Sequence, residues 1–306
     1  MANLFVQNIY NKIEADFGKL KKVGNGNSLF EISSNGVLIY FRYSKLTKKS
    51  RLSSGFYGLR REDIRLLSGK KSFICFVWDS FDEPILVPFS NYEYDFGLFP
   101  PSSDGQYKAH ILFKNSATEF YLANVGKFNI DSFIGLSQLY SFSIHKLKVP
   151  ILSHSQVQSL LCSIGVKKGF DLWVPDSDKL KMDYSIVDFA KMRNKLPIYS
   201  SDIDNIISEI DVIWFENSKP VSFFEVEHST PIYSGLLRFN DVLLTISGVD
   251  NFNIVAENER EGKFSREIRR PTFGQNKLID KVTFLDYENI YNWHFNLTNL
   301  LYEPKF

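Results

Sequence analysis

Two short apolar segments that carry acidic residues constrain the fold more than any other feature. The first is residues 210–215 (IDVIWF), and the second is residues 221–227 (VSFFEVE), with a five-residue turn between them. Both are rich in β-branched and aromatic residues, which is typical of buried central strands. Because the connection is short, we expect the two strands to pair as a hairpin inside a sheet.

Three carboxylates lie on this predicted hairpin. Alternate side chains of a strand share one face, so Glu225 and Glu227 project together while Phe224 and Val226 point the other way. Asp211 stands on the partner strand, and the turn can bring it alongside them. Like charges in apolar surroundings raise one another's proton affinity, and a divalent cation relieves that repulsion. Oxygen ligands suit Mg²⁺, for which Mn²⁺ can substitute, and such an ion can activate water against a phosphate.

The alternative is that these acids face solvent on an edge strand. Apolar neighbours on both segments, such as Ile213 and Phe223, favour the buried arrangement.

The pattern around the hairpin predicts a mixed α/β sheet. We expect an amphipathic helix over 153–164 that ends at Gly165, a strand over 169–174 and a short helix over 203–208. After the hairpin, Ser229 or Thr230 can cap a helix from Pro231 to about residue 246, and a strand follows over 252–256. Strands alternating with helices in this way indicate an α/β domain.

The first half of the chain reads mostly as strands. Candidates are residues 28–32, 37–43, 71–78, 85–88, 107–113 and 119–124, with one short helix within 60–67. Several short strands at this spacing indicate a sandwich or a barrel. We therefore predict two domains, a β-rich one over 1–145 and an α/β one over 146–306.

The near-zero net charge conceals an uneven distribution. Residues 1–80 hold 14 Lys and Arg against 6 Asp and Glu, whereas residues 201–306 hold 10 against 17. A basic amino-terminal surface can meet a polyanion, and an acidic carboxy-terminal part can bind a divalent metal. Solvated faces without a partner explain the same charges.

Several basic residues are candidates for contacts with DNA phosphates. The segment 45–58 combines Lys and Arg with Ser and Gly, and its alternative interpretation is an ordinary exposed loop. Arg238 lies on the helix after the acids, where it could approach a phosphate or pair with Asp241. A basic series from Arg260 to Arg270 could line a DNA channel or form a solvated helical face. The predicted DNA-binding set is Lys45, Lys48, Lys49, Arg51, Arg60, Arg61, Arg238, Arg269 and Arg270.

The two cysteines and the hydropathy indicate in which cellular compartment the protein is expected. Cys75 and Cys162 lie in separate apolar runs without the spacing of a zinc site, so we expect buried thiols in a reducing compartment. No run of about 18 apolar residues occurs, and the amino terminus lacks a basic stretch followed by a long apolar one. We expect a soluble, unexported, cytoplasmic protein.

The acid spacing resembles that of the PD-(D/E)xK restriction-endonuclease-like nucleases. In that pattern an Asp on one strand is followed by Glu-x-Lys on its hairpin partner, and here Asp211 and Glu225 match the two acids. Glu227 stands where Lys is usual, as in a minority of restriction enzymes, and it cannot supply a positive charge. The run 224–238 and its flanks at 169–174 and 266–273 also resemble restriction-associated nuclease domains. The resemblance covers roughly residues 150–290.

The resemblance implies an Mg²⁺-dependent type II restriction endonuclease with a restriction-endonuclease-like mixed sheet. Asp211, Glu225 and Glu227 would be catalytic, with Asp211 and Glu225 binding the metal. The first domain is similar in its strand count to a DNA-binding pseudobarrel, which implies recognition of double-stranded DNA. A palindromic target would suit a homodimer. The alternatives are a modification-dependent restriction nuclease, a DNA-binding protein with an inactive nuclease core, and an interaction protein whose acids face solvent.

Overall fold

The computed structural model describes residues 3–24, 26–49, 52–80, 82–144, 149–197 and 201–300. Contacts divide the chain into two compact units, Met1–Leu147 and Lys148–Phe306. The domain boundary predicted at residues 145 and 146 lies outside the described residues.

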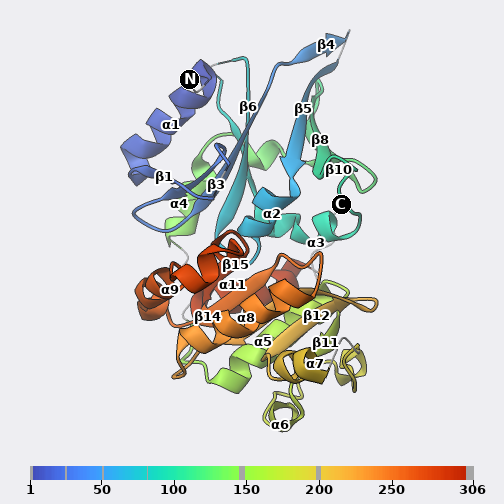
Figure 1. Ribbon diagram of the computed structural model, residues 1–306. Coiled ribbons are helices and arrows are strands. Elements are labelled where there is room, and N and C mark those ends of the chain that lie inside the picture. The colour runs from blue at the N-terminus through green and yellow to red at the C-terminus, as the bar shows by residue number, and fades with distance from the viewer. Residues whose placement is uncertain are drawn as a thin grey trace. The chain divides into compact units, whose positions relative to one another are not determined.

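A five-stranded mixed sheet organises the C-terminal unit (Figure 1). The strand order is β11-β12-β13-β14-β15, in which β11, β12 and β13 are antiparallel neighbours and β14 and β15 run parallel to β13. The predicted acidic hairpin is β12 and β13, which lie inside the sheet rather than at its edge. The strand bounds are Asp171–Trp173 (β11), Val212–Glu216 (β12), Lys219–Val226 (β13), Phe252–Ala256 (β14) and Val282–Asp286 (β15).

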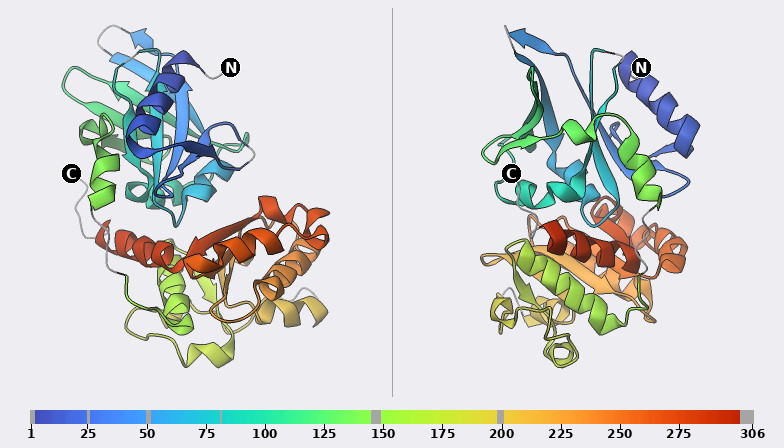
Figure 2. Two further views of the ribbon diagram at one scale, coloured as in Figure 1. Left: turned by 90° about the vertical axis from the view of Figure 1, so that its left-hand side faces the viewer. Right: turned by 180° about the vertical axis from the view of Figure 1, so that it is seen from behind.

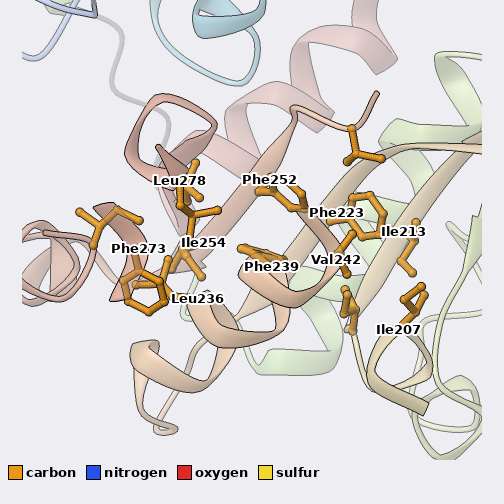
Figure 3. Packing of buried hydrophobic residues seen from close by; sticks show 14 of the residues in the cluster. Ile207, Ile213, Phe223, Leu236, Phe239, Val242, Phe252, Ile254, Phe273 and Leu278 are labelled. Carbon is orange, nitrogen blue, oxygen red and sulfur yellow. The ribbon is translucent and has the colours of Figure 1, made fainter. Parts of the chain in front are cut away.

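The two faces of this sheet pack into separate apolar cores. Along β13, Phe223 faces one core and Phe224 the other, as strand alternation requires. Helix α8 (Ile232–Thr245) covers the face of Phe223. Figure 3 shows the side chains that meet there, including Leu236, Phe239, Val242, Phe252 and Ile254. Each side chain of this size that is fully buried contributes about 1.5–3 kcal/mol.

The opposite face is covered by α5 (His154–Lys167) and α11 (Tyr287–Leu300). Both helices face the viewer in the right-hand view of Figure 2. A capping box starts α5: the Gln156 N–H donates to the Ser153 hydroxyl, and the Ser153 N–H donates to Gln156 Oε1 at 2.8 Å. The predicted end at Gly165 is wrong. The helix continues to Lys167, so Gly165 lies inside it. A Cβ at Gly165 would lie 2.6 Å from Trp214 Nε1, so the glycine allows the helix to pack closely on the sheet.

The remaining helices of this unit include two that the sequence predicts. The predicted helices at 203–208 and 231–246 correspond to α7 (Ser201–Ser208) and α8. The others are α6 (Asp176–Lys179), α9 (Glu261–Glu267) and α10 (Pro271–Gly274). The unit is therefore a mixed α/β domain with helices on both faces of one sheet.

The N-terminal unit contains two five-stranded sheets, ordered β1-β2-β3-β6-β7 and β10-β9-β8-β5-β4. The first has one parallel pair, β3 with β6, and the second is antiparallel throughout. The first sheet comprises Leu20–Lys22 (β1), Leu29–Ile32 (β2), Leu38–Ser44 (β3), Ser72–Trp78 (β6) and Ile85–Pro88 (β7). The second comprises Thr47–Lys49 (β4), Leu52–Arg60 (β5), Gln106–Phe113 (β8), Thr118–Leu122 (β9) and Gly126–Asn129 (β10).

The two sheets share one apolar core. Tyr40 and Phe76 of the first sheet and Tyr57 and Phe120 of the second belong to the same buried cluster. The other face of the first sheet is covered by α1 (Leu4–Phe17). The sheets keep separate strand orders, and within the described ranges they do not close into a barrel. Of the two predicted architectures, the structure therefore shows packed sheets.

Three helices of this unit lie between or beside its strands: α2 (Arg61–Leu67), α3 (Glu93–Gly97) and α4 (Ser137–Ile144). The short helix predicted within 60–67 corresponds to α2, whereas α1 was not predicted. The basic segment 45–58 is not a loop, because most of it forms the β4–β5 hairpin. There Tyr57 is buried and Phe56 is exposed, which is the alternation of a strand with one face in a core.

Both cysteines are free and buried. Burial raises the pKa of the Cys75 and Cys162 thiols well above the usual range, so both are poor nucleophiles. Among the described helices, none combines the length and the apolar character that crossing a bilayer requires.

Candidate active site on the acidic hairpin

The hairpin brings the three predicted acids to one end of the sheet. Val212 pairs with Phe224, so Asp211, which directly precedes β12, lies opposite the end of β13. The backbone N–H of Val226 donates to Asp211 Oδ2 at 2.6 Å. This bond fixes the Asp211 carboxylate beside the backbone of Val226, the residue between Glu225 and Glu227.

Glu225 is the most enclosed of the three acids. It follows Phe223 on the α8 side of the sheet, and 1% of its surface is exposed. Its carboxylate faces Arg238 of α8, whose Nε donates to Oε1 at 2.7 Å and whose Nη2 donates to Oε2 at 2.6 Å. This bidentate pairing is the strongest geometry available to the two groups. Arg238 therefore pairs with Glu225 rather than with Asp241, and its contact with a phosphate stays a prediction.

Glu227 lies on the loop just after β13. Its Oε2 accepts a hydrogen bond from the Thr230 hydroxyl, while its Oε1 is buried without a hydrogen-bond partner. Arg260 donates to the backbone carbonyls of Glu227 and Thr230 and so bridges the two ends of this loop. Arg260 thus supports the acidic loop.

Gly235 of α8 allows the helix to approach both glutamates. A Cβ at this position would lie 2.8 Å from Glu227 Oε1 and 3.1 Å from Glu225 Cβ. Real Cβ atoms do not make contacts that short with neighbours that cannot move. A glycine in the first turns of α8 is therefore part of what holds the acids against the helix.

His154 is a site residue that the sequence analysis missed. Its Nε2 lies 3.4 Å from Asp211 Oδ1, and the contact with Asp211 raises the pKa of the imidazole while burial opposes the shift. Gln158, one turn further along α5, donates to the Asp211 carbonyl at 3.3 Å and to Asp178 Oδ2 at 3.1 Å. The capping box places His154 in the first turn of α5, but only the folded sheet brings that turn to Asp211.

The electrostatics of the site favour a cation. Burial raises the pKa of Glu225 and of Glu227, the negative charge of Asp211 raises both further, and Arg238 lowers both. A carboxylate that is buried near other carboxylates is unfavourable as an anion unless a positive charge compensates it. In the structure, that compensation comes from the Arg238 guanidinium.

The donor chemistry fits a hard divalent ion, although the side chains are not arranged around one. The three acids offer oxygen ligands, and Glu227 Oε1 is a buried acceptor that no donor satisfies. In the described part of the chain, no three His, Cys, Asp or Glu side chains form a group that could hold a metal as they stand. Both oxygens of Glu225 accept hydrogen bonds from Arg238.

The other predicted residues lie apart from this cluster or in other roles. His228 Nδ1 is 3.3 Å from the Tyr287 hydroxyl, and the two rings stack. Arg270 pairs with Glu267 at 2.8 Å and lies over the Tyr233 ring, while Arg269 is exposed.

The basic residues predicted in the N-terminal unit fall on one hairpin and the start of α2. Lys45 and Lys48 are exposed around β4, Lys49 ends that strand, and Arg60 and Arg61 are exposed where β5 passes into α2. Arg51 lies outside the described residues.

Comparison with known proteins identifies the C-terminal unit. The family model for the C-terminal domain of the type II restriction enzyme NmeDI matches residues 143–300, which is more than half of the chain. The type II restriction enzyme NmeDI of Neisseria meningitidis serogroup C is 33% identical over 130 residues, covering 39% of this chain. That alignment spans 37% of the length of the enzyme. No solved structure matches.

The match contains every residue of the acidic cluster. Asp211, Glu225, Glu227 and their partner Arg238 all lie within residues 143–300, as do the five strands of the sheet that carries them. The chain belongs to the family defined by the C-terminal domain of the type II restriction enzyme NmeDI.

Proposed function

We propose that this chain is a divalent-metal-dependent endonuclease of the restriction type, which hydrolyses phosphodiester bonds of double-stranded DNA at a recognised site. The observation that carries the proposal is the coincidence of two features. The family match to a type II restriction enzyme includes Asp211, Glu225 and Glu227, and these acids lie at one end of a buried hairpin. Their spacing further supports a variant of the PD-(D/E)xK site with Glu in the place of Lys.

Each acid has a separate role in this proposal. Asp211 and Glu225 would hold Mg²⁺, or Mn²⁺ in its place, together with the Val226 carbonyl. Glu227 would orient or deprotonate the attacking water, since its Oε1 is a buried acceptor with no present donor. When bound, the divalent ion supplies Lewis acidity toward the phosphate and lowers the pKa of a water ligand. Asp211 is held in place by the Val226 N–H and by His154.

The β-rich unit would recognise the DNA. Its support is the excess of basic residues over residues 1–80 and the exposure of the Lys45 and Lys48 side chains on the β4–β5 hairpin. A homodimer would suit a palindromic target, because a two-fold assembly presents two equivalent sites to the two strands.

A second candidate is a DNA-binding protein with an inactive nuclease core. The bidentate Arg238–Glu225 pair favours it, because both oxygens of a proposed metal ligand are already engaged. A modification-dependent nuclease is the third possibility, and it differs from the first only in the DNA that is cut.

Cleavage of methylated and unmethylated genomic DNA with Mg²⁺ or Mn²⁺ tests all three. We expect cutting by the unaltered protein and its loss in D211N and E225Q, which remove one charge while keeping the side-chain shape. D241N changes an acid of α8 outside the cluster and should cut normally. Undiminished cleavage by E225Q would refute the assignment. An absence of cutting on every DNA would favour the inactive core, and cutting of methylated DNA alone would show dependence on modification.

A further inference from the structure

The Arg238–Glu225 pair occupies the centre of the acidic cluster. Two donors of the guanidinium engage the two carboxylate oxygens at 2.7 and 2.6 Å, and the Glu225 side chain is 1% exposed. In this arrangement each oxygen of Glu225 accepts a hydrogen bond from the guanidinium, so a second cation bound to Glu225 would lie within a few ångströms of it.

Arg238 itself is not enclosed to the same degree. Its side chain is 31% exposed, and it reaches the cluster from α8 rather than from the strands that carry the acids. Asp211 and Glu227 also act on it, since the negative charges of both contribute to raising the pKa of its guanidinium. The guanidinium therefore contacts Glu225, is attracted by the charges of Asp211 and Glu227, and is partly open to solvent.

A divalent cation and this guanidinium compete for the same oxygens. A metal ligated by Glu225 would lie close to the guanidinium that this carboxylate binds, and the two cations repel strongly at a few ångströms in a buried site. Both cannot occupy the cluster in their preferred geometry. One of them must leave when the other binds.

We propose that Arg238 is a placeholder for the divalent cation: it holds Glu225 in the metal-free protein and exchanges to a DNA phosphate when metal and DNA bind. This inference rests on the proposed function. A released guanidinium presents a planar fork that matches phosphate oxygens. The exchange also supplies the positive charge that Glu227 cannot provide in the position where Lys is usual. Arg238 is then a positioning residue before the reaction and a phosphate ligand during it.

The exchange couples metal binding to DNA binding. If phosphate stabilises the released Arg238, DNA must strengthen metal binding, and metal must strengthen DNA binding by the same factor. A guanidinium that only supports the fold gives no such coupling. The coupling is therefore the property that separates the two roles.

The test is a titration of the full chain with Mn²⁺, followed by electron paramagnetic resonance, without DNA and with a non-cleavable DNA duplex. R238Q removes the charge and is expected to bind Mn²⁺ on the order of tenfold more tightly than the unaltered protein without DNA, because a competing charge-assisted pair is gone. DNA should tighten Mn²⁺ binding in the unaltered protein and much less in R238Q. K219Q, which removes an exposed positive charge at the start of β13, at the other end of the strand from Glu225, should match the unaltered protein.

R238K provides a second variant, because Lys keeps the charge without the fork and should give intermediate Mn²⁺ affinity even if R238Q fails to fold. Equal or weaker Mn²⁺ binding in both Arg238 variants would overturn the placeholder. If Mn²⁺ binding is then lost in E225Q, the proposed metal site stands and only the exchange is wrong. If the unaltered protein binds no Mn²⁺ with or without DNA, the exchange and the metal-dependent function are both wrong.

Discussion

At the scale of single residues, buried charge in this molecule is tolerated through specific partners. Glu225 is buried against Arg238, Asp211 accepts a backbone N–H, and Glu227 is bonded to Thr230. Removing one partner of a buried pair typically costs about 3–5 kcal/mol, and less where a partner is partly exposed, as Arg238 is. The residues of the acidic cluster are thus also ones on which the C-terminal unit depends for stability.

Asp63 shows the same principle in the N-terminal unit, and it makes stability depend on pH. Burial raises the pKa of this carboxyl, while a hydrogen bond from Tyr40 and the charges of Arg60 and Arg42 oppose the shift. A raised pKa means that the native state binds the proton more tightly than the unfolded chain. Stability therefore declines as pH rises from the ordinary Asp pKa through the native one.

We expect D63N to lose this dependence. Asn keeps the shape and the acceptor for Tyr40 but does not ionise, so the free energy of unfolding of D63N should fall less as pH rises from the ordinary Asp pKa through the raised native one. Urea unfolding over this range is the measurement. E62Q alters the exposed neighbour of Asp63 and serves as the control. Parallel pH profiles for D63N and the unaltered protein would contradict the prediction.

At the scale of elements, local pattern predicts strands better than it predicts partners. The strand at 252–256 has the predicted bounds, and the acidic hairpin is shifted by one or two residues, because alternation and turn residues are local signals. The pairing of Arg238 with Glu225 is not local. An i,i+3 pair between Arg238 and Asp241 would stabilise the helix by only about 0.2–0.5 kcal/mol. Arg238 therefore pairs with Glu225 instead, because a buried carboxylate without a partner is far less favourable.

The missed features have the same origin. His154 reaches Asp211 and Arg260 bridges the carbonyls of Glu227 and Thr230 only after the sheet has assembled. Residues 45–58 look like a loop because Ser, Gly and Lys are frequent there, yet pairing of β5 with β8 makes most of them strand. Tertiary contacts outweigh local propensity in each case.

Gly235 tests how closely α8 must approach the acidic hairpin. In G235A the new methyl would meet Glu227 Oε1 and Glu225 Cβ at 2.8 and 3.1 Å. Overpacking of this kind costs about 1–3 kcal/mol, which exceeds the gain of about 1 kcal/mol that Ala brings to a helix. We expect lower stability in urea unfolding.

G262A is the matched control for this substitution. Gly262 lies in α9, and a Cβ there would have no neighbour within 4 Å. Its replacement should leave stability unchanged or raise it by up to about 1 kcal/mol. If G235A proved as stable as G262A, the close approach of α8 would not be needed to hold the acids.

At the scale of the whole molecule, the charge is divided along the chain. Residues 1–80 are basic and residues 201–306 are acidic, and the acidic part contains the candidate metal site. Such a division fits a unit that binds the phosphate backbone and a unit that carries the chemistry. The two roles can be separated by substituting residues in the basic unit and measuring both DNA binding and metal binding.

Neutralising the basic hairpin should weaken DNA binding and leave metal binding unchanged. In K45A/K48A two exposed positive charges are lost near β4. If both lysines contact phosphates, the slope of log affinity against log salt should become shallower by about 1.8, because each contact contributes about 0.9. Fluorescence anisotropy with labelled duplex DNA over a salt series measures that slope, and Mn²⁺ titration without DNA should give the same affinity as for the unaltered protein.

The control keeps the change in net charge and alters its position. Lys12 pairs with Glu83 and Lys114 with Glu119, so K12A/K114A also removes two positive charges, but ones that acids already neutralise. We expect this variant to keep the salt slope of the unaltered protein. Equal slopes for the two double variants would mean that overall charge, rather than the β4–β5 hairpin, attracts the DNA. An Mn²⁺ affinity altered by K45A/K48A would mean that the metal site depends on the basic unit even without DNA.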